Sequence, residues 1–169
     1  RWLTAEVEKA AIDYLMRMEV DTQFVSLFHQ KSWPVATRNG SSISNHSHPN
    51  AAISAVFYLN GMQKENGGNL IFHNPNKMLF QGHLIGESIF KSKRVHSDGM
   101  RPVKNMLVLF PSHLNHSVST YKGSEARYSV TYDIALTAGK NVDPGASENI
   151  IPHPSFWTAF KDPPSEDKS

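Results

Sequence analysis

Short strand-forming segments separated by turn residues constrain the fold more than any other feature of this sequence. Three of them are rich in β-branched and aromatic residues, and Gly, Asn or Pro follows each one: residues 52–60, 69–73 and 104–110. Two more, residues 116–121 and 126–136, flank Lys122-Gly123-Ser124 and predict a β-hairpin. Many short strands with frequent turns indicate a closed β-sandwich or barrel.

One amphipathic helix is predicted before these strands, over residues 4–18, with Thr4 as its N-cap. Its apolar residues recur at helical spacing: Val7, Ala11, Tyr14, Leu15 and Met18. The length of 169 residues fits a single domain. We expect that domain to consist of the helix, a core over residues 40–137 that bears the motifs, and a C-terminal tail over 138–169 that is polar and rich in proline towards its end. The segments 30–45 and 76–103 are predicted to be loops that determine substrate specificity.

Composition excludes several classes of site. The chain has no cysteine, which rules out disulfide scaffolds, thiol nucleophiles and cysteine-bound metals, whereas nine histidines are available as ligands. Seventeen basic and 15 acidic residues give a net charge of +2 without a basic patch, so we expect no nucleic-acid partner. No apolar run approaches the roughly 20 residues that cross a bilayer, and the first residues contain no signal-peptide core. These features predict a protein of the cytoplasm, or of the host cytoplasm if a phage encodes it.

Three histidines form the candidate metal site. His46 and His48 lie two residues apart before the segment 52–60, and in an extended chain such residues point to the same side. Taken alone, this pair is more typical of exposed loop histidines. His116 begins a predicted strand, and taken alone it is equally typical of a ligand and of a buried, hydrogen-bonded histidine.

Arg127 and Ser129 share one face of the predicted strand 126–136. Taken alone, such a strand is typical of a solvated surface with the arginine pointing outwards. If Arg127 points inwards, it needs an anionic partner. Asp133 has the same parity but lies roughly 20 Å along the strand, so a bound carboxylate ligand fits the guanidinium better.

The order of these motifs resembles the Fe(II)/2-oxoglutarate-dependent oxygenase superfamily, and within it the prolyl-hydroxylase-like branch with its small bacterial and phage members. The resemblance covers about residues 40–137. It rests on these motifs, in order: His46-x-His48, Phe57-Tyr58-Leu59-Asn60, Gly67-Gly68-Asn69-Leu70, Leu109-Phe110-Pro111-Ser112 with His116, and Arg127-x-Ser129.

This resemblance implies a mainly β fold, a double-stranded β-helix or jelly-roll, with the predicted helix packed outside. It assigns His46, His48 and His116 to Fe(II) as the catalytic metal ligands. It assigns Arg127 to a salt bridge with the distal carboxylate of the co-substrate 2-oxoglutarate, with hydroxyl hydrogen bonds from Ser129 and Tyr58.

One position departs from the usual pattern of the superfamily, because His48 stands where Asp or Glu is the commonest ligand. A neutral ligand makes the site one unit more positive, which should raise the iron potential and favour other divalent metals.

The resemblance implies an iron dioxygenase, most simply a hydroxylase, that uses O₂ and 2-oxoglutarate to oxidise a C–H bond of a further substrate, releasing succinate and CO₂. Two alternatives stay open. One is a metal-binding jelly-roll that binds a small carboxylate without turnover. The other, ranked last, is a zinc hydrolase with three histidine ligands, which has no need of Arg127 and Ser129. Trp33 is expected to be a packing residue, not a platform for substrate.

Overall fold

The computed structural model describes residues 1–61, 64–73, 99–145 and 149–160, so most of the predicted loop 76–103 lies outside the described residues. The described helices and strands are, in chain order, α1 (Trp2–Arg17), β1 (Val25–Thr37), β2 (Ile43–His46), β3 (Ile53–Tyr58), the 3-10 turn Lys64–Asn66, β4 (Leu70–Phe72), β5 (Leu107–Pro111), β6 (His116–Val118), β7 (Arg127–Ala138) and the 3-10 turn Pro154–Phe156.

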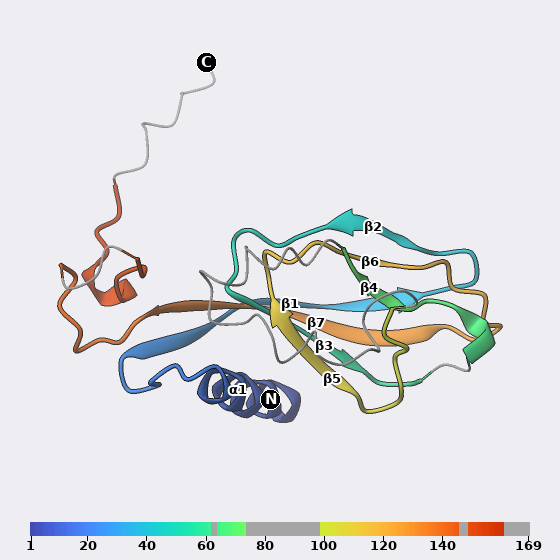
Figure 1. Cartoon of the computed structure of the whole chain (residues 1–169), viewed down its shortest axis with the longest axis horizontal. Coiled ribbons are helices and arrows are strands. Elements are labelled where there is room, and N and C mark those ends of the chain that lie inside the picture. Colours follow the sequence, from blue (N-terminus) through green and yellow to red (C-terminus); the bar gives the residue numbers. More distant parts are fainter. Residues whose placement is uncertain (62–63, 74–98, 146–148, 161–169) are drawn as a thin grey trace, which may run out of the picture.

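The strands form two antiparallel sheets, which lie one above the other in Figure 1. The four-stranded sheet has the order β1-β7-β3-β5, and the three-stranded sheet has the order β2-β6-β4. Between the sheets, Leu70, Phe110 and Val118 form a buried apolar cluster with side chains from both layers. This mainly β jelly-roll arrangement is the fold class predicted from the sequence.

Helix α1 packs outside the sandwich, against the four-stranded sheet (Figure 1). Its buried residues are Val7, Ala11, Tyr14 and Leu15, which are four of the five apolar positions that define the predicted stripe. The predicted cap is wrong. The helix begins at Trp2 with Arg1 as N-cap, so Thr4 lies within the first turn. None of the described helices combines the length and the apolar character needed to span a membrane.

Two sequence predictions about the strands are wrong. Strands β6 and β7 do not form a hairpin, because β6 pairs with β2 and β4 whereas β7 pairs with β1 and β3 in the other sheet. The predicted specificity loop 30–45 is largely strand, since β1 runs to Thr37 and pairs with β7 along its length. Only residues 38–42 of that segment connect β1 to β2.

The C-terminal segment runs away from the sheets (Figure 1). Its residues 151, 156, 157 and 160 are exposed apolar side chains. The described residues of this segment end at residue 160.

Candidate metal centre

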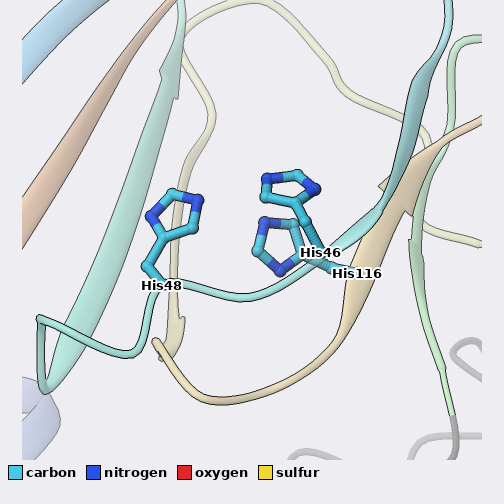
Figure 2. A group of neighbouring side chains, drawn as sticks. All are labelled: His46, His48 and His116. Carbon is cyan, nitrogen blue, oxygen red and sulfur yellow. The ribbon is translucent and has the colours of Figure 1, made fainter.

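The three candidate ligands converge on one point (Figure 2). His46 ends β2, His116 begins β6, and these two residues face each other in the register of the three-stranded sheet. His48 follows in the turn before β3, and its backbone N–H donates to the Ser112 carbonyl at 2.8 Å. One ligand nitrogen from each ring lies within 4.8 Å of the other two.

Hydrogen bonds hold all three rings through the same nitrogen. Nδ1 of His46 donates to the Ser44 carbonyl, and Nδ1 of His116 donates to the Leu114 carbonyl, both at 2.8 Å. Nδ1 of His48 lies 2.6 Å from a carboxylate oxygen of Asp133. Because the acceptors are oxygens without protons, Nδ1 carries the proton in each ring. Each Nε2 is then left with the lone pair that a metal ion requires.

His116 is the buried member of the cluster, whereas His46 and His48 are partly accessible. The pKa of His116 is lowered from its ordinary value to about 4, chiefly by burial and to a smaller extent by the neighbouring His46 and His48, whereas the hydrogen bond to the Leu114 carbonyl and the charge of Asp133 oppose the shift. Phe110 contributes to this burial, with its ring centroid 4.8 Å from that of His116. His116 is therefore neutral near pH 7, the state in which imidazole binds a metal.

Asp133 is the functional residue that sequence reasoning missed. It lies on β7, and its carboxylate contacts His48, the ammonium of Lys31 at 3.1 Å, and the hydroxyl of Ser54 at 3.4 Å. The parity that Asp133 shares with Arg127 was a usable signal for an inward-facing side chain. No local pattern links it to His48, which lies 85 residues away in the chain.

Arg127, Tyr58 and Ser129 form a second buried group. Tyr58 and Ser129 are neighbours in the pairing of β3 with β7, and the Arg127 guanidinium lies 5.3 Å from the centre of the Tyr58 ring. Arg127 donates to the Gly68 carbonyl at 2.5 Å and to the Thr37 hydroxyl at 3.0 Å. It therefore reaches from β7 to the segment that enters β4 in the other sheet.

Burial also governs the protonation of this group. It raises the pKa of Tyr58 to about 12, although the Arg127 charge acts in the opposite direction. It lowers the pKa of Arg127, and Tyr58 and Tyr121 oppose that shift. At neutral pH, Tyr58 is thus a hydroxyl that can donate a hydrogen bond, beside a buried guanidinium.

Trp33 lies closer to the histidines than a remote packing residue would. Its ring centroid is 5.8 Å from that of His48, and the Lys31 ammonium lies 5.0 Å from the centre of its ring.

Asn60 has a structural role, because its side chain donates a hydrogen bond to the Ala126 carbonyl and accepts one from the Tyr128 backbone N–H.

The donor set fits a transition-metal ion. Three imidazole nitrogens with the correct tautomer suit Fe(II) and Zn(II) alike, so the histidines on their own do not select between them.

A match to a protein-family model identifies the family of the chain. Residues 31–133, more than half of the chain, match the model described as "Putative 2OG-Fe(II) oxygenase". The chain belongs to this family. The family implies Fe(II) and 2-oxoglutarate, and the matched residues include all three histidines of the cluster and Arg127.

The chain is also similar to solved structures. The chain is similar to a viral collagen prolyl hydroxylase from Paramecium bursaria Chlorella virus-1 in complex with 2OG, with 10% identity, a TM-score of 0.50, and 80% of this chain and 73% of that chain covered. It also matches a 2OG-Fe(II) oxygenase family oxidoreductase from Burkholderia pseudomallei (15% identity, TM-score 0.46, 66% and 46% covered). A third match is a Pseudomonas putida prolyl-4-hydroxylase (18% identity, TM-score 0.41, 64% and 53% covered).

The chain spans about half the length of the two bacterial structures. A search of the curated proteins found no match.

Proposed function

We propose that this 2OG-Fe(II) oxygenase is a dioxygenase, most simply a hydroxylase, that couples oxidation of a substrate C–H bond to the conversion of 2-oxoglutarate and O₂ into succinate and CO₂. The observation that carries the proposal is the presence of two groups of polar side chains within one sandwich, the histidine cluster and the buried group around Arg127. One offers three Nε2 lone pairs to a metal ion, and the other offers a guanidinium with two hydroxyls.

In this proposal, His46, His48 and His116 hold Fe(II), which supplies the activation of O₂ when it is bound. The role of the chain is to keep the three rings in place. The carbonyls of Ser44 and Leu114 and the carboxylate of Asp133 fix the orientation of each ring and keep its proton on Nδ1. These hydrogen bonds limit the movement of the rings when the metal binds.

Arg127 is proposed to bind the distal carboxylate of 2-oxoglutarate. A guanidinium matches a carboxylate with two parallel hydrogen bonds, and such a pair is strengthened when water is excluded. The Gly68 carbonyl and the Thr37 hydroxyl, which accept hydrogen bonds from Arg127, are neutral groups. The hydroxyls of Tyr58 and Ser129 are proposed to donate to the same carboxylate.

The direct test of turnover is succinate release by the Fe(II)-loaded protein under air. The assay is run with and without candidate amino-acid, peptide and nucleoside substrates. Succinate formed in a manner dependent on Fe(II) and 2-oxoglutarate supports the proposal. A protein that binds both without forming succinate would instead be a binding module.

The co-substrate site is tested by anaerobic titration of 2-oxoglutarate into metal-loaded protein. Loss of a charge-assisted pair in a partly desolvated pocket is worth about 2 to 5 kcal/mol, so Arg127→Ala should weaken binding by roughly 30-fold to several thousand-fold. Arg127→Lys should recover only part of this loss, because ammonium offers no planar fork.

Arg101→Ala is the matched control for this titration, since Arg101 is an exposed arginine and its loss should leave the affinity unchanged. Equal binding of 2-oxoglutarate by Arg127→Ala and wild type would contradict the co-substrate site. With Zn(II) bound and hydrolytic activity present, that result would favour the three-histidine hydrolase.

A further inference from the structure

The three histidines of the proposed metal centre supply no negative charge to a bound ion. Non-haem Fe(II) oxygenases typically use two histidines and one carboxylate, which places one negative charge on the metal. Here His46, His48 and His116 are all neutral ligands, so the described cluster itself supplies no such charge. The carboxylate that contacts this cluster belongs to Asp133, which lies behind His48 and not on the metal.

The contact between Asp133 and His48 is short and buried. One carboxylate oxygen lies 2.6 Å from Nδ1 of His48, and the Asp133 side chain is 2% exposed. In surroundings of low dielectric, a charge at this position acts strongly on the ring and on an ion bound to its far nitrogen. A histidine that donates to a carboxylate is also a more basic metal ligand.

Lys31 offsets this charge only in part. Its ammonium lies 3.1 Å from the second carboxylate oxygen of Asp133, but the Lys31 side chain is 61% exposed. Water therefore screens the lysine, whereas the contact between Asp133 and His48 is shielded from water. The two sides of the carboxylate are thus unequal, and the unscreened side faces the metal ligand.

We propose that Asp133 is a positioning residue that supplies, through His48, the negative charge that a carboxylate ligand would otherwise give to the metal centre. This inference rests on the proposed function, because it assumes that the three histidines hold a metal. It predicts that the charge of Asp133, and not only its hydrogen bond, sets the affinity for metal and the potential of bound iron.

Asp133→Asn separates charge from shape, because asparagine has the same size and still accepts a hydrogen bond from His48. We expect Co(II) binding, followed by the visible absorption of the bound ion, to weaken by about 10- to 100-fold. In the Fe-loaded protein, the Fe(III)/Fe(II) midpoint potential should rise, since losing an anion destabilises Fe(III) more than Fe(II). Asp13→Asn is the matched control, because it removes the charge of an aspartate on α1 whose side chain is 61% exposed, and it should leave both quantities at the wild-type values.

Lys31→Met should shift the midpoint potential in the opposite direction to Asp133→Asn. Because Lys31 is exposed, this variant still tests the role of the Asp133 charge if Asp133→Asn does not fold. Removing the lysine charge should lower the midpoint potential and leave Co(II) binding at least as tight as in wild type. An unchanged or higher potential in Lys31→Met overturns the inference. So does a Co(II) affinity within threefold of wild type in Asp133→Asn.

A purely structural ion pair gives a different result, because both substitutions would then lower the melting temperature of the metal-free protein without moving the potential.

Failure of the proposed function can be distinguished from failure of the inference about Asp133. If wild type binds Co(II) but forms no succinate, the enzyme assignment is wrong, and the two variants still decide the role of Asp133. If wild type binds no Co(II), both proposals are wrong.

Discussion

His116 shows most directly how a single residue serves this site. It is almost fully buried, it donates through Nδ1 to a carbonyl two residues earlier, and its ring contacts those of His46 and Phe110. A buried ring in these surroundings resists protonation, because the charged form would lose its hydration. The burial that keeps His116 available to a metal also makes the metal-free protein sensitive to acid.

We expect the metal-free protein to lose stability as the pH falls from about 6.5 to about 4. Burial lowers the pKa of His116 to about 4, whereas the unfolded chain has the ordinary value of about 6.5. Between these values the unfolded state binds a proton that the folded state does not, so the free energy of unfolding rises with pH and declines on acidification. The difference amounts to about 3 kcal/mol.

Urea denaturation in the presence of a chelator, at pH 7 and at pH 4.5, measures this difference. His116→Gln removes the titrating group and should show a smaller loss of unfolding free energy between the two pH values. A variant with the same pH dependence as wild type would show that another group is responsible.

At the scale of helices and strands, the spacing of residues correctly predicted which side of α1 and of β7 is buried. Helix α1 buries the side that its apolar spacing predicted, because helical periodicity depends only on residues three and four apart. Strand β7 likewise buries Arg127 and Ser129 while Tyr128 between them is exposed, as alternation along a strand requires.

Leu15 provides a test of the packing of α1 on the sheet. It is buried in the cluster that α1 shares with Ile53 and Ile134, whereas the adjacent Met16 is exposed. Leu15→Ala should lower the free energy of unfolding by about 2 to 5 kcal/mol, and the control Met16→Ala should change it by less than about 0.5 kcal/mol. The quantity is measured by urea denaturation, and equal effects of the two substitutions would contradict this packing.

Strand β1 was mistaken for a loop because its sequence lacks the usual strand signals. It lies at the edge of the four-stranded sheet, and residues 29–32 in its centre are all exposed. Pro34 is also tolerated there, since an edge strand can leave one side of its backbone unpaired. Neither strict alternation nor a continuous apolar run marks such a strand.

At the scale of the whole molecule, the metal centre joins segments that are distant in the sequence. His46 and His116 lie on strands of the smaller sheet, and His48 is tied to the larger sheet through Asp133 on β7. A bound ion would therefore stabilise the folded chain as a whole, because the unfolded chain does not hold the three rings together.

We expect chelator-treated protein to melt at a higher temperature when Co(II) is added. At a concentration of 100 times the dissociation constant, the gain is about 2.7 kcal/mol, which corresponds to a rise in Tm of about 5 to 10 °C for a chain of this size. His116→Ala should lose this rise. The control His153→Ala removes a half-buried histidine outside the cluster, whose ring bonds to Ser155, and it should keep the rise. A rise of wild-type size in His116→Ala would contradict the assignment of His116 as a ligand.

The sequence by itself determined what depends on neighbouring residues. This covers the helix, most of the strands and the inward side of β7, because side-chain direction repeats every two residues in a strand and about every 3.6 in a helix. It also covers the proximity of His46 to His48, which are only two residues apart in the chain. The family motifs added His116, which no local pattern links to the other two histidines.

Only the tertiary structure decided how these pieces pair. A short turn between residues 121 and 126 predicted a hairpin, but β6 and β7 enter different sheets, because each finds its partners among strands that are remote in the sequence. The same long-range pairing brings Asp133 to His48 across 85 residues. A contact of this kind depends on the register of whole strands and not on any local repeat, so no inspection of the sequence around either residue could have found it.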